Sequence, residues 1–147
     1  TFDWIRGGNF KEVEDNLERF KEQVKPKALN VNTCISVYNI FQMKEMYLRY
    51  SKSYNYSNYN VVITPMYLRP GLFSKKKIEE ILLDQFGTLD HPGIPSNLLN
   101  ASIILEDQGP EKFEFIKKQF AWWTESMNNV RGFDIFELQP QLRQIIA

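Results

Sequence analysis

Residues 29–38 read LNVNTCISVY, and two sets of side chains alternate along this segment. One set is apolar or β-branched and the other is mostly small and polar, which is the pattern of a strand with two different faces. We therefore expect a strand over about residues 28–38 whose apolar set packs against helices. Asn32 and Ser36 then lie on the opposite face of that strand.

A helix is expected on each side of this strand. Apolar residues from Phe10 to Val24 recur every three or four positions, which predicts an amphipathic helix. Asn9 precedes this helix at the position of an N-cap, and Glu12 three residues later completes a capping-box pattern. A second helix is expected from about Ile40 to Tyr50.

A second strand is expected over about residues 60–65, where a short apolar run is bounded by residues typical of loops. The polar, tyrosine-rich segment 51–59 is interpreted as the loop before it. Ser74 can cap a further helix that ends near Phe86. Helices and strands thus alternate, which favours an α/β fold with parallel strands joined by right-handed helical crossovers.

The two expected strands do not suffice for a free-standing parallel sheet, because such sheets need neighbours and cover on both faces. The sequence also opens at Thr1 without a methionine, so we expect the missing strands in a preceding part of a longer protein. After Gly87 the pattern changes to helices only. Helices are expected over about residues 96–105 and 110–131, followed by a compact tail.

The composition limits the possible function classes. The chain has 147 residues, 18 basic and 18 acidic side chains and a net charge of zero. We therefore expect no nucleic-acid partner, since nucleic-acid binding needs clustered positive charge. No apolar run approaches the roughly 18 residues of a membrane span, so we expect no membrane partner and a cytoplasmic location.

Few single residues carry a chemical signal. Cys34 is the only cysteine, which excludes a disulfide framework and a multi-cysteine zinc or iron–sulfur site built from this chain alone. In the middle of a strand, Cys34 is interpreted as a buried, inert thiol. His91 is the only histidine and is interpreted as a solvated loop residue. No serine or glycine-rich loop has the context of a hydrolase or kinase motif.

Three polar residues are candidates for ligand binding. Arg6 directly precedes a glycine pair before a capped helix, where its guanidinium can form paired hydrogen bonds with a carboxylate. If the strands belong to a barrel, Asn32 and Ser36 face its lumen, where polar groups serve ligands or one another. Strands also carry such residues on an ordinary wetted face, so both interpretations stay open.

Four segments of the chain resemble radical S-adenosylmethionine (radical SAM) enzymes with SPASM or shortened twitch C-terminal regions. Residues 2–20, which begin FDWIRGGNF, are similar to the segment after the fourth strand of that family. Residues 31–47 are similar to its fifth strand and following helix, and residues 60–68 to its sixth strand and next loop. Residues 113–142 are similar to the C-terminal stretch of twitch-type members, so the resemblance covers nearly the whole chain.

The resemblance implies the C-terminal part of a partial (β/α)6 barrel over residues 1–88, with two parallel strands and crossover helices. A helical C-terminal extension follows over residues 89–147. In this family three cysteines near the N-terminus hold a [4Fe–4S] cluster, whose fourth iron site binds S-adenosylmethionine. Reductive cleavage of that cofactor gives a 5′-deoxyadenosyl radical, which abstracts hydrogen from a substrate. The substrate here stays open between a peptide and a small molecule.

The resemblance also implies a set of cofactor-binding residues. Arg6 corresponds to the arginine that helps to fix the carboxylate end of the cofactor. Asn32 and Ser36 correspond to lumen-facing positions beside the cofactor ribose or the substrate. The loop that brackets the adenine corresponds to Pro65, Met66 and Tyr67.

The cluster-binding cysteine motif is absent, and Cys34 cannot replace three cysteines. The resemblance therefore implies that this chain ligates no cluster or metal by itself, carries no catalytic residue, and needs the N-terminal half of the barrel as its partner. A second interpretation is a non-catalytic α/β-helical protein-interaction module with aromatic-rich C-terminal helices. There Trp122, which lies off its helix's apolar stripe, can pack on a partner or on a neighbouring element. A small α/β enzyme without known motifs is the third interpretation.

Overall fold

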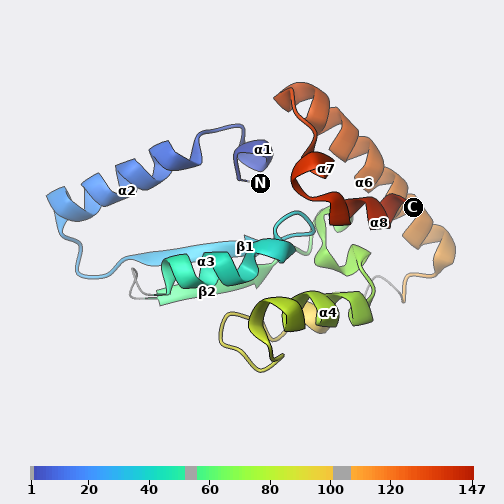
Figure 1. Cartoon of the computed structure of the whole chain (residues 1–147), viewed down its shortest axis with the longest axis horizontal. Helices are drawn as coiled ribbons and strands as arrows, with labels where there is room; N and C mark the ends of the chain where they lie inside the picture. The colour runs from blue at the N-terminus through green and yellow to red at the C-terminus, as the bar shows by residue number, and fades with distance from the viewer. Residues whose placement is uncertain (1, 52–55, 101–106) are drawn as a thin grey trace.

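The computed structural model describes residues 2–51, 56–100 and 107–147. Its architecture is mixed α/β and mostly helical, with two short parallel strands among these residues (Figure 1). In chain order the helices and strands are α1 (Phe2–Arg6), α2 (Phe10–Val24), β1 (Asn30–Ile35), α3 (Met43–Tyr50), β2 (Tyr56–Val61), α4 (Lys75–Phe86), α6 (Pro110–Arg131), α7 (Ile135–Leu138) and α8 (Arg143–Ile146). Short 3-10 turns cover Ile40–Gln42, Met66–Leu68, Pro70–Leu72 and Pro140–Leu142.

β1 and β2 pair in parallel, as predicted. Their register runs from Asn30 opposite Tyr56 to Ile35 opposite Val61. α3 lies in the connection between the two strands, because parallel strands need a crossover rather than a tight turn. The carboxyl ends of both strands consequently meet at one edge of the sheet, referred to here as the carboxyl edge.

β1 ends earlier than predicted, at Ile35 instead of near residue 38. The backbone turns there because the side-chain oxygen of Asn39 accepts a hydrogen bond from the Ser36 amide (2.7 Å). Asn39 directly precedes the Ile40–Gln42 turn, but its side chain makes no cap hydrogen bond to that turn. A side chain that can bond to its own local backbone thus ends the strand.

β2 covers Tyr56–Val61 rather than residues 60–65, so its predicted position is wrong by about four residues. Part of the tyrosine-rich segment predicted as a loop is strand, which agrees with the preference of tyrosine for sheets. The amide of Val62 still donates to the carbonyl of Ile35 (2.8 Å). Because β1 ends at Ile35, Val62 and Ile63 after β2 lie opposite no strand residue in the described part of the chain.

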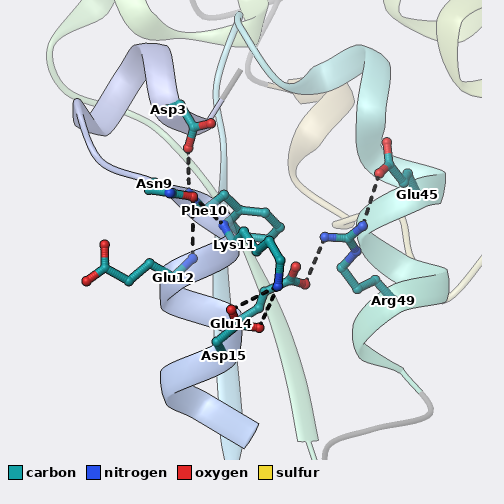
Figure 2. Close-up of polar contacts among 9 residues, drawn as sticks. All are labelled: Asp3, Asn9, Phe10, Lys11, Glu12, Glu14, Asp15, Glu45 and Arg49. Carbon is teal, nitrogen blue, oxygen red and sulfur yellow. Dashed lines mark hydrogen bonds and ion pairs between the residues drawn. The ribbon is translucent and has the colours of Figure 1, made fainter.

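α2 has the predicted bounds and the predicted cap. The side chain of Asn9 accepts hydrogen bonds from the amides of Lys11 (3.1 Å) and Glu12 (3.4 Å), as Figure 2 shows. Asp3 of α1 accepts a further bond from the amide of Phe10 (2.7 Å). Three of the amides at the start of α2 therefore have acceptors, which a helix cannot provide from its own backbone.

α2 and α3 lie side by side. Arg49 of α3 forms an ion pair with Glu14 of α2 (2.8 Å), and its guanidinium lies 5.1 Å from the ring centroid of Phe10 (Figure 2). The rings of Tyr47 on α3 and Tyr59 on β2 are 6.4 Å apart. α3 therefore covers the face of the sheet on which Tyr59 lies, with α2 beside it.

The apolar stripe of α2 is largely uncovered. No residue of this helix is buried, and Val13, Phe20 and Val24 expose 48%, 43% and 56% of their surface. A stripe of this kind normally packs on a core. α2 thus has the amphipathic pattern of a helix that packs on a core, but its apolar residues are not buried.

The buried core lies beyond the carboxyl edge of the sheet. α6 contacts α1, the Met66–Leu68 turn and α8 there. The largest fully buried side chains are Trp4, Tyr38, Phe120, Ile35, Ile40, Met43, Ile78, Leu82, Leu98, Ile135 and Leu142. α1 and α6 lie near opposite ends of the sequence and contact each other, so the two terminal regions share one core.

α6 confirms the predicted long helix. Pro110 lies at its first turn and Gly132, with a φ of 73°, ends it in the left-handed conformation that glycine tolerates. α4 likewise begins after the predicted cap Ser74, whose side chain accepts from the Lys77 amide. The helix predicted over residues 96–105 falls partly on residues 101–106, outside the described residues.

Candidate functional site

One face of the two-stranded sheet is polar and open. Residues in register in a parallel pair point to the same side, so Asn32 lies beside Asn58 and Cys34 beside Asn60. Asn32, Cys34 and Asn60 are exposed and Asn58 is half-buried. These four residues are referred to as the asparagine face. Asn32 therefore lies on the face away from α3, as predicted.

Cys34 is exposed, so the prediction of a buried thiol is wrong. It follows Asn32 by two positions and shares its face, whereas its neighbour Ile35 is fully buried on the other. The alternation of side chains between the two faces of the strand, rather than the hydrophobicity of the thiol, determines the environment of Cys34.

His91 lies in a loop, as predicted, but it is half-buried rather than fully solvated. Its ring centroid lies 4.4 Å from that of Phe86 and 4.8 Å from that of Tyr47. Its Nδ1 accepts a hydrogen bond from the Gly93 amide (3.0 Å). The imidazole thus fills the contact between α3 and α4.

The prediction that Ser36 shares the open strand face with Asn32 is wrong, because Ser36 lies in the turn after β1 and is buried, with 7% of its surface exposed. Its hydroxyl accepts a hydrogen bond from the Tyr38 amide (3.3 Å), and its amide donates to the side chain of Asn39 (2.7 Å). The side-chain amide of Asn39 in turn donates to the carbonyl of Cys34 (2.9 Å). Ser36 therefore shapes the turn at the carboxyl edge, with its polar atoms engaged there.

Arg6 is the last residue of α1 and is exposed. Within the described part of the chain it makes no side-chain hydrogen bond or ion pair, including with Asn32. Its neighbour Gly7 has a φ of 66°, and the guanidinium of Arg131 lies so close that a side chain at residue 7 would collide with it. The Nε of Arg131 donates to the carbonyl of Trp4 (3.0 Å).

Arg131 was not among the residues predicted for the site. It lies beside the turn that carries Arg6 only because α6 packs on α1, and the hydrogen bond that fixes it spans 127 sequence positions. No local pattern could have indicated this contact. The structure thus places a second guanidinium at the turn between α1 and α2.

Pro65, Met66 and Tyr67 follow β2 and are half-buried. The carbonyl of Leu68 accepts a hydrogen bond from the amide of Val37 (2.9 Å), which ties this loop to the turn after β1. The loop that the resemblance assigned to the adenine therefore lies at the carboxyl edge of the sheet.

An aromatic cluster joins the elements that carry these residues. Ring centroids of Trp4 lie 4.8 Å from Tyr38 and 5.6 Å from Trp123, and Tyr67 lies 6.0 Å from Trp123. α1 with Arg6, the turn after β1 and the loop after β2 thus meet around one cluster. Aromatic pairs at these separations add to the free energy of burial.

Buried hydrogen bonds fix this aromatic cluster. The Tyr38 hydroxyl lies 2.6 Å from that of Thr124, which itself donates to the Phe120 carbonyl (2.6 Å). Burial raises the pKa of the Tyr38 phenol, and the bond to Thr124 opposes that shift only in part. The indole nitrogen of Trp4 donates to the side chain of Asn128 (2.9 Å).

A [4Fe–4S] cluster does not fit this chain. Such clusters are held by several cysteine thiolates, and the sequence has one cysteine. Over residues 2–51, 56–100 and 107–147, no group of three or more His, Cys, Asp or Glu side chains could hold a metal ion. The same ranges contain no helix with the length and apolarity to cross a membrane.

Comparisons with protein-family models, curated proteins and solved structures returned no match to this chain.

Proposed function

We propose that this chain is the C-terminal part of a cytoplasmic radical SAM enzyme of the twitch type, and that β1 and β2 belong to a partial (β/α)6 barrel. The N-terminal half of that barrel is its partner and supplies the cysteines for the [4Fe–4S] cluster. The substrate is a peptide or a small molecule.

The difference between the two faces of the sheet is the observation that carries this proposal. α3 covers one face, where Tyr47 meets Tyr59, and α2 joins α3 through the ion pair of Glu14 with Arg49. The asparagine face on the other side is polar and open. Helices outside a parallel sheet and polar residues inside it are typical of a barrel section whose lumen holds a ligand.

The positions of the predicted cofactor residues support the same function. Ligand sites of parallel α/β sheets lie beyond the carboxyl ends of the strands. The turn with Ser36 and the loop with Tyr67 both lie at this edge. α1, which carries Arg6, reaches the same region through the contact of Trp4 with Tyr38.

β1 and α2 indicate where the N-terminal half would bind. Among the described residues β1 pairs only with β2, which leaves one edge of β1 unpaired. In Figure 1, α2 lies on the side of β1 away from β2, and it exposes its apolar stripe. A parallel strand added beside β1 would use the unpaired edge and cover the stripe.

S-adenosylmethionine would be held by residues of this chain, whereas the cluster would not be. Arg6 has no acceptor among the described residues, so its guanidinium is free to hold a carboxylate. Asn32 is exposed on the open face and would contact the ribose or the substrate, whereas Ser36 would shape the turn beside it. When bound with its cluster, the cofactor supplies the 5′-deoxyadenosyl radical that abstracts hydrogen from the substrate.

The reading frame upstream of Thr1 tests the proposal. We expect it to encode a first strand and then three cysteines, the first two separated by three residues and the last two by two. A start codon immediately before Thr1 would contradict the radical SAM function.

Exposed apolar residues on α6 favour a second candidate function, a protein-interaction module. Phe115, Trp122 and Val130 expose 60%, 68% and 71% of their surface. They lie seven and eight positions apart and therefore on one flank of the helix. If this flank binds a partner protein, Trp122→Gln will weaken that binding and leave cofactor cleavage unchanged.

A further inference from the structure

Arg69 is a buried cation near the carboxyl edge of the sheet. Only 7% of its surface is exposed. It lies between the Met66–Leu68 and Pro70–Leu72 turns, and its Nε donates a hydrogen bond to the carbonyl of Ile63. Ile63 follows β2 by two residues, so Arg69 lies where ligand sites of parallel sheets form.

No carboxylate of residues 2–51, 56–100 or 107–147 forms an ion pair with this guanidinium. The ion pairs among the described residues use other cations. The side chain of Arg69 has no hydrogen bond in the described ranges except that to Ile63. A carbonyl oxygen carries no full charge and satisfies only the Nε donor, so the donors of both terminal nitrogens have no acceptor in the described part of the protein.

A buried charge without a partner is destabilising, and arginine is almost never fully buried unless it is paired. Both terminal nitrogens of Arg69 nevertheless keep some contact with solvent, because neither is a fully buried atom without a partner. The Nε of Arg69 is therefore held by a carbonyl oxygen, while the terminal nitrogens keep open donors and a small contact with solvent. This is the geometry with which arginine binds carboxylates and phosphates through two parallel hydrogen bonds.

We propose that Arg69 anchors an oxyanion-binding site at the carboxyl edge of the sheet, and that its ligand carries a carboxylate or a phosphate group. Arg69 is not one of the residues that the radical SAM resemblance assigned to the cofactor. The site therefore goes beyond the proposed function and stands whether or not the complete protein cleaves S-adenosylmethionine.

Thermal unfolding of the protein expressed from its whole reading frame tests this site. The midpoint is measured in sodium phosphate, sodium acetate and sodium chloride at equal ionic strength. We expect phosphate or acetate to raise the midpoint above that in chloride, because an anion that binds only the folded state stabilises it. A rise in phosphate alone assigns a phosphate group to the ligand, and a rise in acetate assigns a carboxylate.

Substitutions test whether the rise in the unfolding midpoint depends on the two terminal nitrogens of the Arg69 guanidinium, the planar fork. Arg69→Met removes the charge and keeps most of the stem, so the rise should disappear while the midpoint in chloride is unchanged or higher. Arg69→Lys keeps the charge without the planar fork and should weaken anion binding about tenfold in calorimetry. Arg19→Met removes an exposed arginine of α2 and should keep the full response.

Equal midpoints of the wild-type protein in the three salts would overturn the proposal. A response that Arg69→Met retains in full would overturn it as well. If Arg69→Met does not fold, Arg69→Lys decides, since unchanged anion affinity in that variant means that the fork does not contact the ligand.

Discussion

Thr124 has a single hydroxyl proton, and the geometry of α6 determines where it lies. The Phe120 carbonyl, 2.6 Å from the hydroxyl, can only accept, so Thr124 donates there and accepts from Tyr38. Among the residues that the structure describes, Thr124 is thus the hydrogen-bond partner on which the Tyr38 hydroxyl depends. Thr124 by contrast keeps one hydrogen bond when Tyr38 is changed.

This asymmetry predicts unequal effects of two substitutions. Thr124→Val leaves a buried phenol without an acceptor and should lower the free energy of unfolding by about 1–3 kcal/mol. Tyr38→Phe removes the donor and leaves Thr124 bonded to Phe120, so about 0.5–1.5 kcal/mol is expected. Urea unfolding of the complete protein measures both. A larger cost for Tyr38→Phe would contradict the assignment of the proton.

The Tyr38 phenol also predicts a dependence on alkaline pH. Burial raises its pKa in the folded state, whereas an unfolded tyrosine titrates near pH 10. The unfolded state therefore loses its proton first, and stability falls as the pH rises above about 10, by up to about 1.4 kcal/mol per pH unit.

Tyr38→Phe removes that contribution, so its urea midpoint should fall less steeply than the wild-type midpoint above about pH 10. Burial also raises the pKa of Tyr59, but this residue is present in both proteins and does not affect their difference. Parallel pH curves for the two proteins would contradict the expected role of Tyr38.

At the scale of single elements, helix ends and the parallel pairing of the strands were predictable, whereas the register of the second strand was not. The stripe and cap of α2 and the glycine after α6 lie within their own segments, and both helices have the predicted ends. β2 lies earlier than predicted because its register is set by β1, where Val61 must lie opposite Ile35. A run of apolar residues predicts burial but cannot say which of its residues a partner strand will reach.

The cap of α2 can be tested separately from global stability. Asn9→Ala removes the acceptor for the amides of Lys11 and Glu12 and should destabilise the helix by about 1 kcal/mol. Because no residue of α2 is buried, we expect faster amide exchange, about fivefold, confined to this helix.

Asn16→Ala is the matched control on the same helix. Asn16 lies in the interior of α2, where alanine is the better helix former. Its amide exchange should be unchanged or slower. A similar acceleration in both variants would contradict the capping role of Asn9.

At the scale of the whole molecule, the candidate site could be predicted only in part. Asn32 was placed on its correct face from alternation alone, because alternation is local. The positions of Arg131 and Arg69 depend on how α6 packs on α1 and on how the loop after β2 folds back to Ile63. Such contacts between distant segments leave no periodic signal in a sequence.

The uncovered surfaces predict the behaviour of this chain when expressed alone. The unpaired edge of β1 and the stripe of α2 should cause aggregation or partial unfolding. Adding the separately expressed N-terminal half should give a soluble complex in analytical ultracentrifugation.

Val13→Glu combined with Phe20→Glu is the control for this prediction. The double variant should make the chain alone more soluble and prevent its association with the N-terminal half. A wild-type chain that is monomeric by itself and melts in one sharp transition would contradict the prediction.

Release of 5′-deoxyadenosine by the complete protein tests the proposed function most directly. After anaerobic reconstitution with iron and sulfide, we expect a brown protein that releases this nucleoside when it is reduced with S-adenosylmethionine present. Arg6→Gln should release it more slowly at low cofactor concentration, and Arg19→Gln should not. A colourless protein that releases no 5′-deoxyadenosine would contradict the radical SAM function.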